Sequence, residues 1–405
     1  MIEEHEARGR ILERIWVLPS ERVPLRAAQN RFVAERLCAR LCIPPFDNAA
    51  VDGFALGLRN EAGAAAGERF RVMGEQAAGR TRSFRLAAGE ALRIFTGAPL
   101  PAGAGAVQMQ EETEWEADGD ELVLRGSVDR GDFIRRRGGD VVEGEVLLEP
   151  GRRLGPRQLA LLASQGCREI SVARRPRISI VVTGSELRAP GEDLAEGEIY
   201  ETNGIQLEAL CRAAGAEVLG VDHCEDESLP LRRTLDQAAE GCDALLISGG
   251  MSVGSHDHVR PVLKEMGLEQ VFWGVNLKPG KPFLFGLLDT RPVYGFPGNP
   301  VSVFVCFLRF CFPALLRFQG VASEDTEPPE LSCRLGERVC NPGPRPHWVR
   351  GRHDRERGLF RPVGVQASHG AGGLSAANAL MRMPGNSDWS EGREVRIQLL
   401  EGWLL

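Results

Sequence analysis

Three glycine-bearing segments follow apolar runs in the second half of the chain, and their residue types suit phosphate binding. They are Thr183-Gly184-Ser185-Glu186, the segment Ser248 to Gly254 with Gly249, Gly250 and Ser252, and the segment Pro297-Gly298-Asn299-Pro300. Glycine lets the backbone approach a ligand closely, and free amides at a helix start favour an anion. For any one of these segments taken alone, the alternative interpretation is a tight turn without a ligand. Three of them after strands of one sheet would share an edge, so we expect one anion site there.

Three carboxylates accompany these segments. Glu186 lies in the first, Asp226 follows the apolar run at 216–221, and Asp257 comes just after the second. Magnesium prefers a few oxygen ligands together with substrate phosphates and water. We therefore expect Glu186, Asp226 and Asp257 to hold Mg²⁺ beside the anion. The alternative interpretation of each carboxylate is a solvated charge on a loop. This alternative is best supported for Asp226, because Asp226 lies in an acidic run.

Two lysines lie on either side of a Pro-Gly turn in the segment Asn276 to Pro282. A rigid turn that presents the ammonium groups of Lys278 and Lys281 suits a polyanion, although such turns are also common on surfaces.

An upstream group of segments, FDNAAVDGFA, IFTGAP and RRRGGD, contains Asp52, Thr96 and Asp140. An acid inside an apolar loop must be solvated or have a partner, so Asp52 is either a ligand-facing group or a turn cap.

The surrounding elements are predicted from periodicity. Residues 6–42 show helical spacing, residues 68–148 show short alternating strands, and residues 155–166 show one further helix. From Arg177 to about Gln319, β-branched apolar runs alternate with amphipathic helices, which predicts a doubly wound parallel α/β domain. The segment 300–316 is expected to be a buried helix rather than a membrane span. Short strands return after residue 331.

These elements predict a multidomain α/β protein with four parts. We expect a helical and linker domain at 1–46 and 147–174, a β-rich insert at 47–146, an α/β nucleotide-binding domain at 175–323 and a C-terminal β domain at 324–405.

Composition excludes several classes of function. The formal net charge of −7, from 49 basic and 56 acidic residues, argues against nucleic acid or an anionic membrane as partner. The N-terminus lacks the pattern of a secretory signal, and the ten cysteines form no Cys-x-x-Cys pair. We therefore expect a cytoplasmic protein with reduced cysteines.

The motifs together resemble one family. In order, FDNAAVDGFA, IFTGAP, RRRGGDVVEGE, VVTGSEL, IYETN, ISGGMSVGSHD, LKPGKPF and FPGNPVS are similar to segments of the molybdopterin molybdenumtransferase family, which includes bacterial MoeA and the gephyrin E domain. The resemblance covers essentially the whole chain. It implies an elongated homodimer in which the α/β domain binds adenylyl-molybdopterin and the partner subunit's N-terminal part completes the cleft. Molybdate and this nucleotide would react, with Mg²⁺, to give molybdenum cofactor and AMP.

The resemblance also implies roles for individual residues. The family's functional acids and threonine match Asp52, Thr96, Asp140, Glu186, Asp226 and Asp257. Lys278, Lys281 and Arg350 would neutralise molybdate or phosphate oxygens, and Asp52 and Thr96 would orient the pterin. The backbones of Gly249, Gly250 and the loop Pro297 to Pro300 would hold the phosphates, with Ser252 and Ser368 also in the substrate site.

Two departures from the family pattern concern this site. Ser185 stands where the family usually has aspartate, and Ala367-Ser368-His369 interrupts a stretch of small residues.

Two other functions use related chemistry. A molybdopterin adenylyltransferase has a similar nucleotide fold, but the extra domains argue against it; such an enzyme would instead be the partner that supplies the substrate. A gephyrin-like scaffold would not need the acids present at every matched position.

Overall fold

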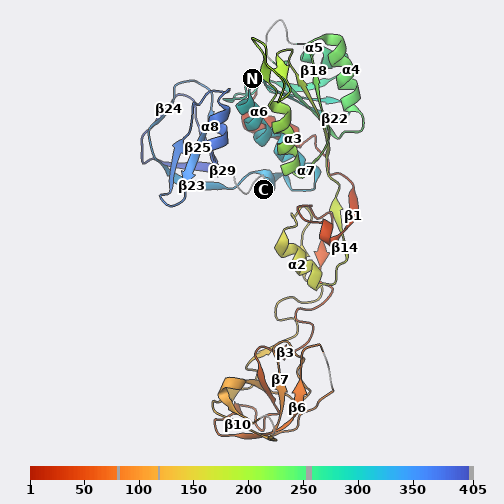
Figure 1. Ribbon diagram of the computed structural model, residues 1–405, viewed down its shortest axis with the longest axis vertical. Helices are drawn as coiled ribbons and strands as arrows, with labels where there is room; N and C mark the ends of the chain where they lie inside the picture. Colours follow the sequence, from red (N-terminus) through yellow and green to blue (C-terminus); the bar gives the residue numbers. More distant parts are fainter. Residues whose placement is uncertain (80–82, 117–118, 252–257, 401–405) are drawn as a thin grey trace. The chain divides into compact units, whose positions relative to one another are not determined.

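The computed structural model describes residues 1–79, 83–116, 119–251 and 258–400 (Figure 1). The chain divides into two compact units, and the four predicted domain boundaries stay predictions. Unit 1 comprises Met1–Glu35, Pro150–Leu159 and Glu169–Leu405, and unit 2 comprises Arg36–Glu149 and Ala160–Arg168.

A six-stranded sheet forms the centre of unit 1. Its order is β18-β15-β19-β22-β21-β20, and the first four strands are parallel. The doubly wound α/β fold is therefore confirmed. The strands β20 and β21 run antiparallel at one edge of the sheet and were not predicted. The strands are β18 (Glu217–Cys224), β15 (Arg177–Thr183), β19 (Ala244–Ser248), β22 (Arg291–Phe296), β21 (Leu284–Leu288) and β20 (Glu269–Trp273).

Helices cover both faces of this sheet, as the alternation of buried side chains requires. On β19, Ala244 and Leu246 pack into one core, whereas Leu245 and Ile247 pack into the other. Such alternation places successive side chains of a strand on opposite faces. The first core contains α3 (Asn203–Ala213), α6 (Pro300–Cys306) and α7 (Phe312–Phe318), and the second contains α4 (Ser228–Ala239) and α5 (Val259–Glu265).

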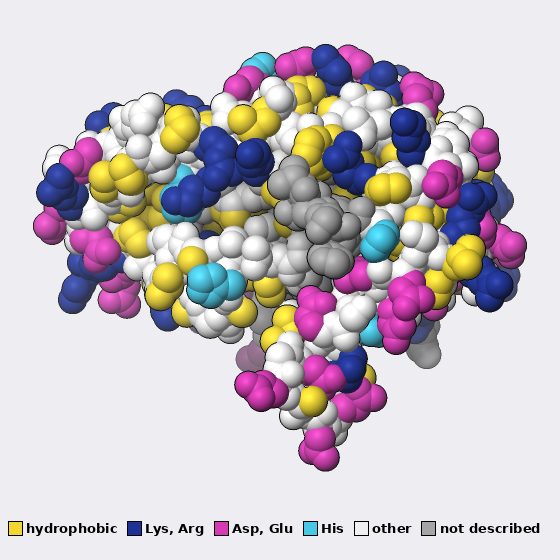
Figure 2. Space-filling view, turned by 90° about the horizontal axis from the view of Figure 1, so that it is seen from above, with side chains coloured by type: hydrophobic (Ala, Val, Ile, Leu, Met, Phe, Trp, Pro, Cys, Tyr) yellow, Lys and Arg dark blue, Asp and Glu magenta, His cyan; other side chains and the backbone are white. Residues whose placement is uncertain are grey.

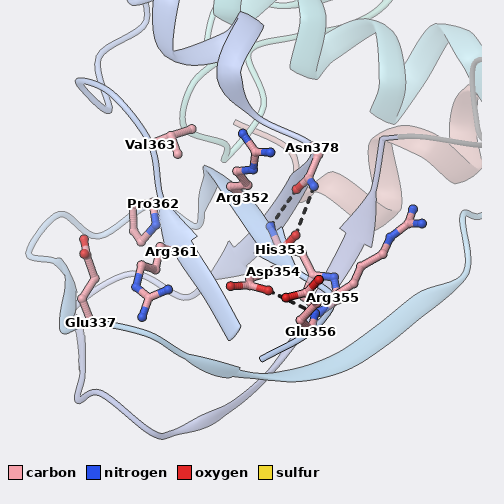
Figure 3. Close-up of a pocket in the computed structure, with 10 residues that line it drawn as sticks. All are labelled: Glu337, Arg352, His353, Asp354, Arg355, Glu356, Arg361, Pro362, Val363 and Asn378. Carbon is pink, nitrogen blue, oxygen red and sulfur yellow. Dashed lines mark hydrogen bonds between the residues drawn. The ribbon is translucent and has the colours of Figure 1, made fainter. Parts of the chain in front are cut away.

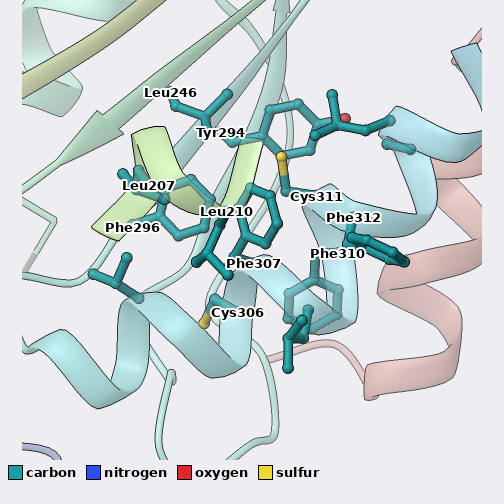
Figure 4. Close-up of a cluster of buried hydrophobic side chains, with 14 of the residues drawn as sticks. Leu207, Leu210, Leu246, Tyr294, Phe296, Cys306, Phe307, Phe310, Cys311 and Phe312 are labelled. Carbon is teal, nitrogen blue, oxygen red and sulfur yellow. The ribbon is translucent and has the colours of Figure 1, made fainter. Parts of the chain in front are cut away.

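The first core is rich in aromatic side chains. Phe283 and Phe310 are stacked with ring centroids 4.7 Å apart, and Figure 4 shows Phe296 and Phe307 between the sheet and the long helix. That helix runs through the π-helical segment η3 (Phe307–Cys311) between α6 and α7. By length and hydropathy alone, Pro300–Phe318 could cross a membrane, but 89% of its most apolar window is buried within the fold. The predicted buried helix is confirmed.

The C-terminal part of unit 1 is a closed barrel, in agreement with the predicted β domain. Its strands follow the order β23-β26-β25-β27-β29, and the short helix α8 (Ala371–Ala376) contacts β25. The strands are β23 (Glu330–Leu335), β26 (Leu359–Pro362), β25 (His347–Asp354), β27 (Ala379–Met383) and β29 (Glu394–Leu399).

The predicted N-terminal helices are only partly present. The helix α1 (Glu4–Leu12) forms, but it ends well before the apolar spacing does. The helical structure predicted for residues 30–41, within the range 6–42, is wrong. Phe32 and Val33 bridge to Arg153 and Val172, and β2 (Leu37–Cys38) pairs with β13 (Val146–Leu148). These distant backbone partners override the local helical spacing.

Unit 2 contains the predicted all-β insert. Its main sheet follows the order β8-β4-β7-β6-β10-β9. The strands are β8 (Ala106–Met109), β4 (Gly53–Leu56), β7 (Glu90–Ile94), β6 (Arg69–Gln76), β10 (Glu121–Leu124) and β9 (Thr113–Glu114). The predicted helix at 155–166 is also confirmed as α2 (Pro156–Ser164), after which Gly166 has φ +72°.

Candidate active site

The carboxyl ends of four parallel strands meet at one edge of the sheet in unit 1. Thr183 at the end of β15 lies opposite Cys224 at the end of β18. Ser248 at the end of β19 is paired with Val182 on one side and with Phe296 of β22 on the other. The segments that follow these residues therefore start side by side, as we expected. Gly249, Gly250, Glu186, Asp226 and the loop Pro297 to Pro300 all belong to this edge.

Glycine is required in the second loop. Gly249 has φ +99°, and a Cβ atom there would lie 2.3 Å from the carbonyl oxygen of Thr183. Gly250 has φ +57°, and its Cβ would lie 2.4 Å from Cγ2 of Val259. Both positions need the conformational freedom and small size of glycine. The other predicted residues of this loop, Ser252 and Asp257, lie outside the described residues.

Asn203 joins the second and third loops, and the sequence analysis did not single it out as a site residue. Its Nδ2 donates to Ser248 Oγ at 3.0 Å and to the carbonyl oxygen of Gly298 at 2.7 Å. The available signal was its place in the IYETN motif, where it is the first residue of α3.

Two polar atoms at this edge are buried without a hydrogen-bond partner among the described residues. They are Oγ1 of Thr183 and Oδ1 of Asn203, whose residues are 4% and 8% exposed. Buried polar atoms normally have a partner, which can be protein, water or a ligand. These atoms are therefore consistent with a polar ligand site at this edge.

The carboxylates at this edge come from neighbouring loops. Glu186 is exposed and Asp226 is half-buried. The backbone N–H of Asp226 donates to Oγ of Ser185 at 3.3 Å, so Ser185 joins the two loops. Oxygen donors of this kind fit magnesium, which keeps several waters. Within the described residues no three His, Cys, Asp or Glu side chains gather as a metal-binding group, and the third predicted ligand, Asp257, lies outside them.

The third loop leads directly into a helix. Pro297 is buried, Gly298 and Asn299 are exposed, and Pro300 is the first residue of α6. Asn299 occupies the cap position, but its side chain makes no capping hydrogen bond. The N–H of Val301 donates to the carbonyl oxygen of Ser368 at 3.2 Å. This contact places the predicted residue Ser368 beside the start of the helix.

The predicted basic residues lie where this domain meets the barrel. Lys278 is half-buried and Lys281 is exposed. The backbone of Lys278 donates to the carbonyl oxygen of Pro346 and accepts from the N–H of Trp348, both at 2.8 Å, so its loop is fixed to β25. Although the chain is acidic overall, the view in Figure 2 shows Lys and Arg side chains gathered to the left of its centre.

Arg350 lies on β25 and is 1% exposed. Its two Nη atoms donate to the carbonyl oxygens of Val365 and Ala367. The guanidinium group therefore holds the loop that carries Ser368, in addition to any charge it contributes to the site.

His347 is a further residue of this region that the sequence analysis missed. It is 5% exposed, and its pKa is lowered to about 4, chiefly by burial and also by the cations Lys278, Arg350 and Arg345. Both effects disfavour the charged imidazolium. The imidazole is thus neutral near pH 7, mainly because it is buried and in part because cations surround it. A lone histidine after a proline gave no signal of this in the sequence.

Unit 2 brings Asp52 and Thr96 together. Gly53, which follows Asp52, is paired with Ile94, two residues before Thr96, in the pairing of β4 with β7. Asp52 Oδ1 accepts from the Thr96 N–H at 2.7 Å and from its Oγ1 at 2.8 Å. These two hydrogen bonds lower the pKa of the exposed Asp52 carboxyl, which is therefore ionised at neutral pH. Asp140 is also exposed in unit 2.

A separate pocket of about 720 Å³ opens on the barrel. Figure 3 shows Arg352, Arg361 and Asn378 among the side chains around it, and none of the predicted site residues lines it. Its lining mixes cationic and anionic side chains: Glu337, Arg352, His353, Asp354, Arg355, Glu356, Arg361, Pro362, Val363 and Asn378. It does not belong to the sheet edge described above.

Three sequence families match successive parts of the chain. Residues 2–166 match the MoeA N-terminal region (domain I and II), residues 179–317 match a probable molybdopterin binding domain, and residues 332–400 match the MoeA C-terminal region (domain IV).

Similar proteins and structures extend over nearly the full length. Molybdopterin molybdenumtransferase of Haemophilus influenzae is 33% identical over 91% of each chain, and that of a Nostoc species is 32% identical over 93% of this chain and 88% of the relative. A crystal structure of the molybdopterin biosynthesis MoeA protein from Pyrococcus horikoshii is 32% identical, with a TM-score of 0.83 over 98% of this chain and 100% of that one.

Proposed function

Because the chain belongs to the molybdopterin molybdenumtransferase family, we propose that it inserts molybdenum from molybdate into adenylyl-molybdopterin, with release of AMP. Relatives with this name match about nine-tenths of the chain, which favours this activity over adenylyl transfer or a purely scaffolding role. The observation that carries the site assignment is the meeting of glycine loops and oxygen donors at one sheet edge, with lysines and arginines beside it.

We propose that the sheet edge holds the diphosphate of the nucleotide. The amides around Gly249 and Gly250 and at the start of α6 can approach phosphate oxygens closely. Oγ1 of Thr183 and Oδ1 of Asn203, which have no hydrogen-bond partner among the described residues, would supply further polar contacts at the same edge. Cleavage of a diphosphate depends mainly on positioning and charge neutralisation, so no side-chain nucleophile is required.

We propose Lys278, Lys281 and Arg350 as the anion-binding cluster for molybdate. Lys278 and Lys281 would pair with its oxygens, while Arg350 supplies positive charge and holds the loop of Ser368. His347 lies beside these cations: burial is the main cause of its lowered pKa, and Lys278, Arg350 and Arg345 lower it further. Asp52 and Thr96 would orient the pterin, with Asp140 as a further acid of the N-terminal region.

Magnesium is proposed as the metal of the reaction. Glu186 and Asp226 would hold it with Asp257, and it would neutralise the charge that develops on the diphosphate oxygens.

We further propose a cytoplasmic homodimer whose substrate comes from a separate adenylyltransferase. The ten free cysteines, most of them buried, are consistent with a reducing compartment.

The reaction itself tests the function. Purified protein is incubated with adenylyl-molybdopterin and molybdate, with and without Mg²⁺, and AMP is measured. We expect AMP release that needs molybdate and Mg²⁺, and a loss of at least about tenfold in Lys278→Met because a charge-assisted contact disappears. Lys264→Met, at the end of α5, is the matched control and keeps wild-type activity. Unchanged nucleotide under all conditions would refute the proposal.

A further inference from the structure

We propose that Glu4 is a positioning residue for the anion-binding cluster and that residues 2–4 hold Lys278 and Arg350 in their relative places. The inference rests on the proposed function, because it concerns how the cluster for molybdate is built. It adds a role for the N-terminal segment of unit 1, which carries none of the residues assigned to the site so far.

Glu4 is a buried carboxylate with donors from three elements. It is 5% exposed, although it lies in the first turn of a short helix. Its Oε1 accepts from Arg309 Nε at 2.6 Å and from Trp348 Nε1 at 3.1 Å, and its Oε2 accepts from Arg382 Nε at 3.0 Å. The donors come from η3, β25 and β27 respectively. One side chain thus ties α1 to the long core helix and to two strands of the barrel.

Arg309 is the buried counterion of Glu4. It is 7% exposed, its guanidinium lies 4.6 Å from the centre of the Trp348 ring, and its Nη1 donates to Gln398 Oε1 at 3.1 Å. A buried ion pair contributes little net stability, because desolvation offsets the attraction between the charges. Its directional hydrogen bonds nevertheless fix which groups face each other. The network is therefore better suited to setting the position of the barrel than to stabilising the fold.

One path runs from Glu4 through Trp348 to two members of the cluster, Lys278 and Arg350. The Trp348 indole bonds to Glu4, and the backbone N–H of the same residue donates to the carbonyl oxygen of Lys278 at 2.8 Å. Arg350 is two residues further along β25, so its side chain leaves the same face of the strand. A shift of Trp348 would therefore move Lys278 and Arg350.

A second path acts on the chain just before Lys278. The N–H of Ile2 donates to Gly274 O at 3.1 Å, and the N–H of Asn276 donates to Ile2 O at 2.8 Å. The Asn276 side chain also donates to Glu3 Oε1 at 2.8 Å. Ile2 and Glu3 therefore hold the chain that leads into the Lys278 loop. Glu4 holds β25, the strand that carries Arg350.

The test compares Glu4→Gln and Trp348→Phe with Glu6→Gln. Trp348→Phe removes the indole N–H but keeps an aromatic ring, so it remains informative where Glu4→Gln does not fold. Glu6 lies on the same helix and pairs with Arg10 at the surface. Calorimetry gives the dissociation constant for molybdate, and NMR titration gives the pKa of His347, which is sensitive to Lys278 and Arg350.

We expect Glu4→Gln and Trp348→Phe to weaken molybdate binding by about tenfold, as small displacements of a binding group can do. We also expect the pKa of His347 to rise in both, with neither quantity changed in Glu6→Gln. Unchanged molybdate binding and an unchanged pKa of His347 in Glu4→Gln and Trp348→Phe would overturn the inference. A wild-type protein that neither binds molybdate nor releases AMP would instead refute the proposed function, and the His347 titration would still decide whether Glu4 positions the cluster.

Discussion

Asp52 and His347 both have lowered pKa values, but for opposite physical reasons. Hydrogen bonds from Thr96 stabilise the charged form of Asp52, whereas burial and nearby cations destabilise the charged form of His347. Near pH 7 the first group therefore keeps its charge and the second has none. For the proposed reaction, this leaves an ionised acid in unit 2 and a neutral imidazole beside Lys278, Arg345 and Arg350.

Acidification should destabilise the protein through His347. Its folded pKa of about 4 lies below the ordinary value of 6.5, so the unfolded chain binds the proton first as the pH falls. The stabilising effect of the neutral imidazole is complete above pH 6.5 and is lost between pH 6.5 and pH 4. By pH 4.5 the free energy of unfolding should fall by about 2–3 kcal/mol from this group alone. Urea unfolding at pH 7 and 4.5 measures the change.

The variant His347→Gln isolates this contribution from those of the other titrating groups. It should lose about 2–3 kcal/mol less than the wild type over the same pH interval. Equal losses in the two proteins would show that the imidazole does not stay neutral in the fold.

At the scale of elements, the loop after β19 depends on glycine at position 249. Gly249→Ala would force a Cβ to within 2.3 Å of a backbone oxygen at a positive φ. We expect it to lower the free energy of unfolding by more than about 2 kcal/mol and to abolish AMP release. Gly241→Ala is the matched control, because Gly241 has φ +72° but no atom within 4 Å of the added Cβ. It should cost only about 1 kcal/mol and keep activity. If the two substitutions changed the free energy of unfolding and AMP release equally, the close contact between position 249 and the Thr183 carbonyl oxygen would not be what requires glycine there.

The alternating strands and helices of the α/β domain could be predicted because their signals are local. The strand β15 is a nearly continuous buried apolar run, and α3 and α4 show helical spacing between turn residues. Their order along the chain also predicted that the glycine loops share an edge, since parallel strands place their carboxyl ends together.

The segment 30–41 could not be predicted for a different reason. Its apolar residues have helical spacing, but Phe32, Val33 and Leu37 find backbone partners more than 100 residues away. Nothing within a short window indicates these partners.

Long-range partners also explain what the sequence missed at the site. Asn203 bonds to Gly298, Ser185 bonds to Asp226, and His347 lies beside Lys278. The residue types alone suit many surface positions. Each acquires its role only when the fold brings its partner close.

At the scale of the whole molecule, the residues assigned to the reaction are divided between two compact units. Lys278, Arg350 and the glycine loops belong to unit 1, and Asp52, Thr96 and Asp140 belong to unit 2. The net charge of −7 is compatible with anionic substrates only because cations gather locally in unit 1. In the proposed homodimer, each site would combine unit 2 of one subunit with unit 1 of its partner.

Mixing two inactive variants tests this arrangement. Asp52→Ala would disable the contribution of unit 2, and Lys278→Met that of unit 1. If subunits exchange freely, about half of the dimers combine both variants, and each of these has one complete site and one doubly defective site. The mixture should therefore recover about a quarter of wild-type AMP release. Mixing Asp52→Ala with Asp140→Ala, which both alter unit 2, should recover none. Activity no greater than the sum of the separate variants, in a mixture shown by light scattering to be dimeric and exchanged, would mean that each site is built from a single subunit.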